Sequence, residues 1–357
     1  MKNVKKFAAL LLALIMVLSL VACGGSSSSS SGSESTESTE STESTDAAVE
    51  NTGETYTIRI GHSDTTSNLI HINLERFAAA VNERTNGQVE IQIFASEQLG
   101  SNAEMIEMVE MGSLDAMMLP SGQQASYACE KFYALSLPFL FADYDHVYRV
   151  LDGEIGEELL EGLEDHNMIQ LAYWENGLRQ FTNNVRAIET PADMEGLKFR
   201  TPEDALTVAI FNAYGASAAP FAFSELYLAL QQGTFDGQEN PVANIHANNF
   251  QNVQKHLTMV NYQYQPKNMI FSLSTWNKLP EDIQTVLKEA AVEFGNQHRQ
   301  DIRDNEESQL ADLVAAGMEV GYPDTQPFID QAQSVYDDFY AKYDWAEDLV
   351  ARINELK

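Results

Sequence analysis

The stretch from Pro280 to Ala316, PEDIQTVLKEAAVEFGNQHRQDIRDNEESQLADLVAA, decides the architecture of this chain. It contains no proline after its first residue, and apolar side chains such as Ile283 and Leu287 recur at helical spacing. One helix over this stretch would be roughly 50 Å long, which exceeds a single small lobe. We therefore predict one helix that bridges two lobes. The alternative is two shorter helices that break at Gly295, because glycine costs a helix interior ~1 kcal/mol relative to alanine.

Upstream of this helix, strands and helices alternate. Residues 55–60 and 89–93 show the period-two alternation of strands, and residues 115–119 form a short apolar strand that Pro120 ends. Between these strands, apolar side chains recur at helical spacing, which predicts a helix in each of the two gaps. This β–α–β–α–β series predicts a mostly parallel sheet covered by helices.

A second series begins at Met168. We expect a strand over 168–174, a turn at Glu175-Asn176-Gly177 and another extended piece over 179–182. Further short strands are predicted at 196–201 and 235–238. About 300 residues in all follow the N-terminal region, which is enough for two lobes with their own cores.

The N-terminal region carries targeting signals. Lysines precede an apolar run over residues 7–20, which is too short for a comfortable membrane span and is typical of a signal peptide over residues 1–22. Leu20-Val-Ala-Cys23 resembles a bacterial lipobox, and this implies lipid attachment at Cys23. An ordinary signal peptide with an incidental cysteine is the alternative. Residues 23–53, rich in Ser, Thr and Glu, are expected to be a disordered tether.

Composition excludes several functions. The chain holds 21 Lys and Arg against 53 Asp and Glu, a net charge of −32, which argues against a nucleic-acid partner. The seven histidines lack metal-ligand spacing, and no phosphate loop or dinucleotide fingerprint occurs, so we expect no metal and no cofactor. Cys129 is expected to be a packing thiol rather than a nucleophile.

Because positive charge is scarce, an arginine at a strand end stands out. In Leu197-Lys-Phe-Arg-Thr-Pro202, alternation places Arg200 opposite Leu197 and Phe199, and Pro202 ends the strand. Arg200 thus lies at the carboxyl end of a strand, where open α/β sheets bind ligands. A guanidinium offers two planar donors that match a carboxylate. The alternative is a structural salt bridge to one of the many acidic residues.

Two other polar residues stand near expected strand ends. Arg179 follows the predicted turn, and Asn240, whose amide both donates and accepts, precedes Pro241. Asp236 and Glu239 are two carboxylates that could form the acid–base pair of a glycosidase, but their spacing on an extended stretch sends them to opposite faces. Taken singly, these signals are weak.

Five motifs follow one another along the chain: SEQLG (96–100), NGLRQFTN (176–183), GLKFRTP (196–202), PFAFSELYLALQ (220–231) and GQENP (237–241). In this order and spacing they resemble the DctP-type solute-binding proteins of TRAP transporters. The resemblance covers Thr55 to about Tyr340. It implies an α/β, two-lobed fold of the type II periplasmic-binding-protein kind, with a long helix bridging the lobes. Lobe I is expected to comprise 54–177 with about 266–305, and lobe II 178–265 with about 306–357.

The resemblance also implies ligand-binding roles. Arg200 is expected to hold a ligand carboxylate bidentately, Arg179 matches a second arginine aimed at the ligand, and Asn240 matches the polar residue of the GQENP loop. Phe223 is expected to form an apolar wall.

The chain departs from the sialic acid binders of the family, some of which carry acidic residues where it has Ser121 and Asn102. A sugar acid, such as a uronate or aldonate, or a C4-dicarboxylate fits these uncharged residues at least as well. Four residues near the end of the first strand are expected to reach ligand hydroxyls: Ser63, Asp64, Asn68 and His71.

These features together predict a monomeric lipoprotein outside the cytoplasm that binds a small organic acid anion and delivers it to TRAP membrane subunits. It touches the membrane through its lipid anchor only and is not an enzyme. Two alternatives stay open. One is a secreted hydrolase that acts on a sugar-acid conjugate, and the other is a binding protein that serves an ABC importer.

Overall fold

The computed structural model describes residues 53–357, and the predicted signal peptide, Cys23 and nearly all of the tether lie outside the described residues. Nine strands form one sheet in the order β2-β1-β3-β8-β4-β7-β5-β6, and β9 pairs with β8. The strands are β1 (Tyr56–Gly61), β2 (Val89–Phe94), β3 (Ala116–Pro120), β4 (Met168–Asn183), β5 (Lys198–Thr201), β6 (Ser217–Pro220), β7 (Gly237–Asn240), β8 (His256–Ser272) and β9 (Glu319–Gly321).

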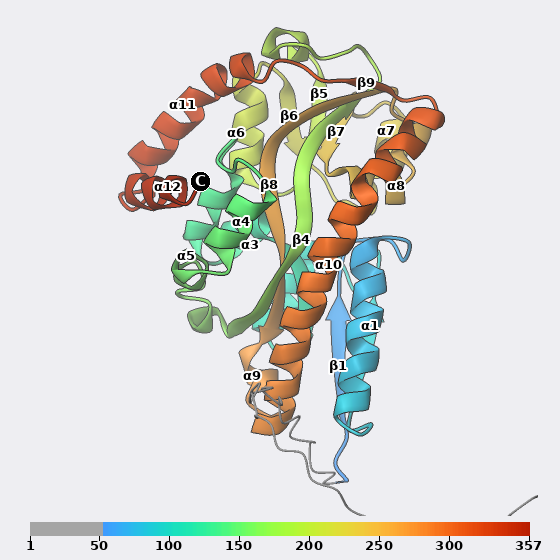
Figure 1. The fold of residues 1–357 in the computed structure, drawn as a ribbon, viewed down its shortest axis with the longest axis vertical. Coiled ribbons are helices and arrows are strands. Elements are labelled where there is room, and N and C mark those ends of the chain that lie inside the picture. Colours follow the sequence, from blue (N-terminus) through green and yellow to red (C-terminus); the bar gives the residue numbers. More distant parts are fainter. Residues whose placement is uncertain (1–52) are drawn as a thin grey trace, which may run out of the picture. The chain divides into compact units, whose positions relative to one another are not determined.

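Helices cover this sheet and connect its strands (Figure 1). The α-helices are α1 (Leu69–Arg84), α2 (Asn102–Glu110), α3 (Ser121–Tyr127), α4 (Tyr144–Leu151), α5 (Glu154–Glu158), α6 (Ala205–Ala213), α7 (Leu226–Gln231), α8 (Val242–Ala247), α9 (Leu273–Trp276), α10 (Glu281–Ala315), α11 (Gln326–Lys342) and α12 (Ala346–Glu355). Short 3₁₀ turns are η1 (Glu130–Ser136), η2 (Glu164–His166), η3 (Pro191–Met194) and η4 (Phe250–Asn252). None of the helices within residues 53–357 combines the length and apolarity that a membrane span requires.

The sheet is mixed rather than mostly parallel, which corrects the prediction. Parallel pairs lie toward its two ends, where β1 pairs with β2 and β3, and β5 pairs with β6 and β7. Between these groups, the long strands β4 and β8 pair antiparallel and run side by side through the middle of the fold (Figure 1). The β–α–β pattern in the sequence predicts only how strands that are close along the chain pair with one another. It does not predict that the long strands β4 and β8 join the two parallel groups.

The predicted turn at Glu175-Asn176-Gly177 is wrong, because these residues lie inside β4. Glu175 pairs with Pro266 of β8 and Gly177 with Gln265, so Asn176 is an extra residue in the ladder. Such a bulge bends a strand and re-aims a side chain. Gly177 has φ +118°, a conformation that glycine adopts without strain. The bulge therefore allows β4 to continue while Asn176 faces the cavity described below.

The single long helix is confirmed as α10, and the alternative of a break at Gly295 is wrong. Figure 1 shows α10 running alongside β4, and it contacts both α1 and α8. Gly295 lies where the helix approaches Trp174, whose indole Nε1 donates to Ala291 O at 2.9 Å. A Cβ at position 295 would stand 2.9 Å from Trp174 Cδ1 and 3.0 Å from its Nε1. The glycine therefore permits close packing rather than ending the helix.

Replacing Gly295 by alanine is expected to lower the free energy of unfolding by up to roughly 2 kcal/mol. Overpacking a tight contact costs about 1–3 kcal/mol, and the gain in helix propensity of about 1 kcal/mol offsets part of it. Chemical denaturation measures the change. Val292→Ala is the matched control. Val292 lies in the same helix and is half-exposed, so its truncation changes little packing. A Gly295→Ala protein more stable than wild type would contradict the packing role.

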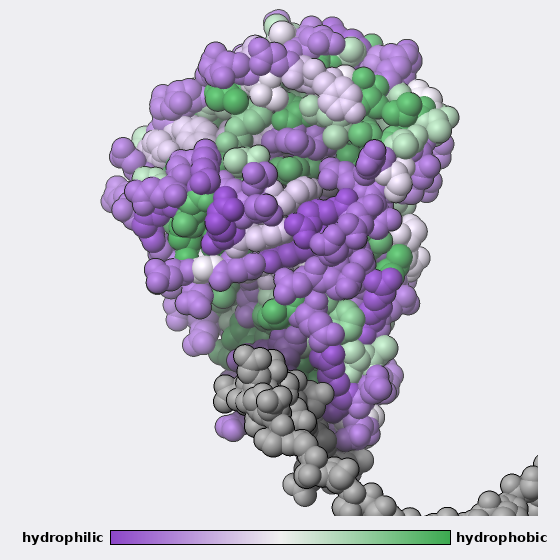
Figure 2. All heavy atoms as spheres, viewed as in Figure 1, coloured by the Kyte–Doolittle hydropathy of each residue, from purple (hydrophilic) through white to green (hydrophobic). Residues whose placement is uncertain are grey.

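Separate cores support the two halves of the sheet. One surrounds Phe77, Trp174 and Phe271, and another surrounds Phe181 and Phe199. Helix α12 shares a third core with residues 132–159, although the two segments are predicted to belong to different lobes. The limits of the two lobes stay a prediction. Figure 2 shows a face dominated by hydrophilic residues, with apolar ones in small separate groups, as the net charge leads one to expect.

Candidate functional site

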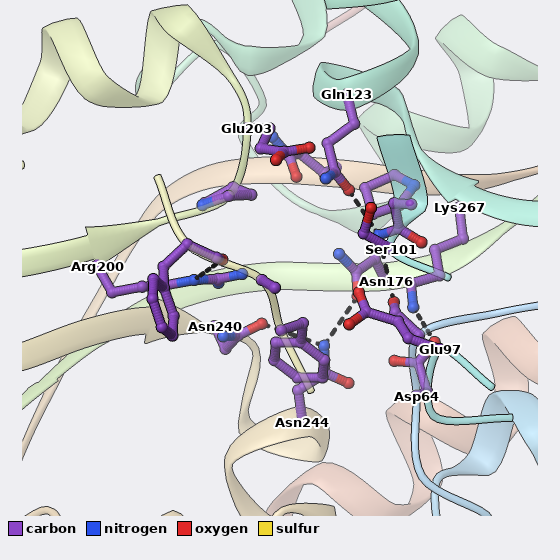
Figure 3. Close-up of a pocket in the computed structure, with 18 of the residues that line it drawn as sticks. Asp64, Glu97, Ser101, Gln123, Asn176, Arg200, Glu203, Asn240, Asn244 and Lys267 are labelled. Carbon is purple, nitrogen blue, oxygen red and sulfur yellow. Dashed lines mark hydrogen bonds and ion pairs between the residues drawn. The ribbon is translucent and has the colours of Figure 1, made fainter. Parts of the chain in front are cut away.

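Polar side chains from both halves of the sheet surround a cavity that opens in part to solvent (Figure 3). Seven residues singled out from the sequence line it: Ser63, Asp64, Asn102, Arg179, Arg200, Phe223 and Asn240. They come from the ends of β1, β5 and β7, from β4, and from the segments that follow. The carboxyl ends of the parallel strands thus converge on one cavity, as expected for an open α/β sheet.

Arg200 presents its guanidinium to this cavity. Its Nε donates to Phe221 O at 2.8 Å, and its Cζ lies 5.5 Å from the centroid of the Phe223 ring. The side chain is buried, yet Arg200 forms no salt bridge with any residue of the described chain. Burial lowers the pKa of Arg200 to about 10, so the group stays charged at neutral pH. A pairing with a neighbouring acid, the alternative considered above, does not describe this geometry.

Arg179 lines the same cavity but its charge is already paired. Its Nη2 donates to Glu239 Oε1 at 2.7 Å and its Nε donates to Oε2, and Tyr262 Oη also donates to Oε2 at 2.7 Å. In the antiparallel pairing of β4 and β7, Phe181 lies opposite Glu239. Arg179 is two residues before Phe181 in β4, so it shares a face of the sheet with Glu239 and lies close enough to pair with it. Burial opposes the charge on Arg179, but Glu239 raises the pKa of the guanidinium above its ordinary value. Arg200 is therefore the unpaired arginine of the lining.

Side-chain amides form a network between the two halves. Asn244 Nδ2 donates to Asn240 Oδ1 at 3.2 Å and to Asn176 Oδ1 at 3.1 Å, and Asn240 Oδ1 also accepts from Arg179. Asn68 Nδ2 donates to Asn244 Oδ1 at 2.8 Å. Because amides donate and accept at once, such a lining suits a ligand with hydroxyl groups.

The far end of the cavity holds a buried ion pair between Asp64 and Lys267. Lys267 Nζ donates to Asp64 Oδ2, and the Asp64 backbone N–H donates to His62 Nδ1 at 3.2 Å. Burial opposes the charged form of Asp64, but Lys267 and His62 hold the pKa of this carboxyl below its ordinary value. Both side chains line the cavity, so the pair is a fixed polar group that a ligand meets.

Three of the residues expected at the site lie apart from this lining. Asn68 caps α1 by accepting from Ile70 N at 3.0 Å, and it borders a smaller adjacent pocket. His71 Nδ1 lies 3.0 Å from His62 Nε2, and Ser121 is buried at the start of α3. Neither His71 nor Ser121 lines the cavity. Ligand contact by any of the ten residues remains a prediction.

Sequence reasoning missed several lining residues: Glu97, Gln123, Asn176, Asn244, Gln265 and Lys267. One signal was present in β8, where Gln263, Gln265 and Lys267 recur at every second position between apolar residues. Alternate residues of a strand share a face, so three buried polar side chains there indicate a polar site. Asn176 gives no such signal, because Glu175-Asn176-Gly177 is a sequence typical of a turn.

A buried carboxyl group, Glu175, lies in the bulge of β4. Tyr148 Oη donates to Glu175 Oε2 at 2.8 Å, while Oε1 finds no donor among the described residues. Burial raises the pKa of Glu175 from its ordinary value of 4.5 to about 7. This carboxyl group is thus partly protonated at neutral pH.

Because the folded pKa lies above the unfolded one, folding favours protonated Glu175. Its contribution is fully present below pH 4.5 and is lost as pH rises through about 7. Relative to a Glu175→Gln variant, the wild-type free energy of unfolding should fall by roughly 3 kcal/mol between about pH 5 and pH 8. Denaturant unfolding at the two pH values measures this. Parallel pH profiles for the two proteins would show that Glu175 does not titrate in this range.

Known proteins of similar sequence identify the family of this chain. The family model for bacterial extracellular solute-binding proteins, family 7 (DctP), matches residues 60–343. A solute-binding protein from Verminephrobacter eiseniae is 37% identical over 264 residues, which are 74% of this chain and 78% of that protein. The 2,3-diketo-L-gulonate-binding periplasmic protein YiaO of Escherichia coli is 31% identical, over 84% of this chain and 92% of YiaO.

A solved structure is equally similar. The TRAP periplasmic solute-binding protein of Polaromonas sp. JS666, bound to D-erythronate, is 33% identical with a TM-score of 0.80. The match covers 84% of this chain and 98% of that protein. The fold and the site therefore define a two-lobed α/β solute-binding protein of the extracytoplasmic class. The chain belongs to family 7 of the bacterial extracellular solute-binding proteins, the DctP family. The resemblance inferred from its motifs is confirmed.

Proposed function

We propose that this protein is the extracytoplasmic binding subunit of a TRAP transporter, and that it captures a small carboxylate-bearing molecule for import. The ligand is a sugar acid, such as a uronate or aldonate, or a C4-dicarboxylate. The observation that carries the proposal is the buried guanidinium of Arg200, which faces the cavity without an ion-pair partner among residues 53–357.

A carboxylate is the natural partner for such a group. The planar donors of arginine match both carboxylate oxygens, and charge-assisted hydrogen bonds of this kind are about twice as strong as neutral ones. Removal of water on closure strengthens the attraction, because the local dielectric constant falls. The ligands named for YiaO and for the Polaromonas protein are both sugar acids, which supports the same class here.

The proposal includes the protein's surroundings. After cleavage of residues 1–22, lipid on Cys23 holds a monomer at the outer face of the membrane, and residues 23–53 tether it within reach of TRAP membrane subunits. The protein binds its cargo without changing it and needs no cofactor. Burial raises the pKa of the Cys129 thiol to about 11, so this thiol stays protonated and is a poor nucleophile.

Native mass spectrometry combined with a thermal-shift panel of uronates, aldonates, keto acids and dicarboxylates tests the proposal. We expect at least one acid to raise the unfolding temperature and to be recovered with unchanged mass, because a ligand that binds only the native state stabilises it. Recovery of a cleaved product would favour the hydrolase. Transport that requires an ABC importer, rather than TRAP membrane subunits, would favour the other alternative. No shift with any acid would contradict the carboxylate class.

A further inference from the structure

We infer that the cavity selects a polyhydroxylated acid with one carboxylate and that the Asp64–Lys267 pair rejects a second carboxylate. The inference rests on the proposed function and narrows it, because it chooses the sugar monoacids over the C4-dicarboxylates. Two observations carry it: the buried amide oxygens of the lining that lack donors, and the pairing of all its cations but one.

The first observation concerns hydrogen-bond donors. Gln265 Oε1 and Asn102 Oδ1 are buried, belong to residues that line the cavity, and accept no hydrogen bond within the described chain. The orientation of Gln265 is set by its Nε2, which donates to Asp204 Oδ2 at 2.9 Å. Leaving a buried acceptor unsatisfied costs about 1–3 kcal/mol. A ligand hydroxyl that reached either oxygen would supply the missing donor, whereas an ionised dicarboxylate without hydroxyls offers acceptors only.

The second observation concerns charge. Among residues 53–357, three cations line the cavity. Arg179 is paired with Glu239 and Lys267 with Asp64, so only Arg200 of these three is unpaired. Glu97 and Glu203 also line it. One carboxylate therefore finds one unpaired cation, and a second would lie among acidic groups with no free cation to receive it. Beside the buried carboxylate of Asp64, such like-charge contact is unfavourable.

The position of the Asp64–Lys267 pair extends the second observation. Figure 3 shows Arg200 on one side of the cavity and the Asp64–Lys267 pair on the other, with Asn240 and Asn176 between them. A ligand whose carboxylate meets Arg200 thus presents its other end to the pair. Lys267 has three N–H donors, and Asp64 is its one acceptor among the described residues. A terminal hydroxyl can donate to Asp64 and accept from Lys267. A terminal carboxylate would instead lie against the Asp64 carboxylate and be repelled by it.

Matched pairs of acids test the inference by calorimetry. Erythronate and meso-tartrate, or gluconate and glucarate, differ only in a terminal hydroxymethyl group or carboxylate. Across four to six carbons, we expect the monoacid that binds best to bind at least about tenfold more tightly than its diacid. Succinate, which has no hydroxyl group, should bind more weakly than the monoacid by a similar factor.

Substitutions at the pair locate the discrimination. Asp64→Asn leaves Lys267 unpaired and should shift the ratio of diacid to monoacid affinity by about tenfold toward the diacid. In the double variant Asp64→Asn/Lys267→Gln that shift should be smaller, because the ammonium that attracts the diacid is gone together with the carboxylate that repels it. Thermal unfolding checks that each variant folds. If Asp64→Asn does not fold, the wild-type ratios for the diacids and for succinate decide alone.

The outcomes separate the two proposals. A wild-type protein that binds the diacid or succinate as tightly as the monoacid overturns this inference and leaves the proposed function standing. The same holds if Asp64→Asn folds and leaves the ratio unchanged. A protein that binds none of the acids overturns the proposed function itself. An Arg200→Ala variant that binds them undiminished overturns the anchoring role of Arg200, and with it this inference.

Discussion

Replacing Arg200 by alanine is expected to weaken binding of the carboxylate ligand by roughly 30- to 1,000-fold, a loss of about 2–4 kcal/mol. The loss is large because the ligand anion would enter a closed cavity without its counter-charge. The ligand-free protein should be no less stable than wild type, since the substitution removes a buried cation that has no ion-pair partner within residues 53–357. Calorimetry with the tightest acid of the panel measures the first effect, and thermal unfolding measures the second.

A surface arginine provides the control for this experiment. Arg84 is paired with Glu293 at 2.6 Å, with both side chains exposed and outside the cavity, so Arg84→Ala should leave the affinity unchanged. Arg200→Lys keeps the charge but loses the planar pair of donors, and intermediate affinity is expected. Equal affinity of wild type and Arg200→Ala would show that the anion is held elsewhere.

Replacing Glu239 by alanine is expected to lower the free energy of unfolding by roughly 3–5 kcal/mol. Glu239 is fully buried, and its loss leaves the Arg179 guanidinium unpaired in the interior and removes the acceptor of Tyr262 Oη. Denaturant unfolding measures the change. The matched control is Glu293→Ala, which breaks the exposed pair with Arg84 and should cost no more than about 1 kcal/mol.

A double variant tests whether the loss of stability in Glu239→Ala arises from leaving Arg179 unpaired. In Arg179→Met/Glu239→Gln no charge remains, and the amide oxygen can still accept from Tyr262. Stability should therefore recover in large part relative to Glu239→Ala, because a neutral replacement of a buried pair is often tolerated. If the double variant is as unstable as the single one, packing rather than the unpaired charge explains the loss.

Local patterns in the sequence predicted much of the fold. The helical spacing over residues 280–316 identified α10, alternation identified β1 and β2, and a short apolar run ended by Pro120 identified β3, because these patterns follow from the geometry of single elements. The family motifs were also local, and the family model confirms them. Where prediction failed, as at Glu175-Asn176-Gly177, local turn propensity was overridden by pairing with a strand some ninety residues later in the chain.

The same distinction applies to the site. Arg200 was identifiable because its strand, its neighbours and the proline after it lie within one short segment. The pairing of Arg179 with Glu239 was not, since it joins residues on two strands that only the sheet brings together. Lys267 was overlooked for the same reason, because its partner Asp64 lies more than two hundred residues earlier.

By itself, the sequence determined the class of the protein and the long helix, and it singled out Arg200 as the candidate partner of an anion. Each of these depends on residues that are neighbours along the chain. Only the tertiary structure decided which of the charged groups around the cavity are paired with one another and which are not. That outcome depends on distances between segments far apart in sequence, and in a buried site a few ångströms separate a paired charge from an unpaired one.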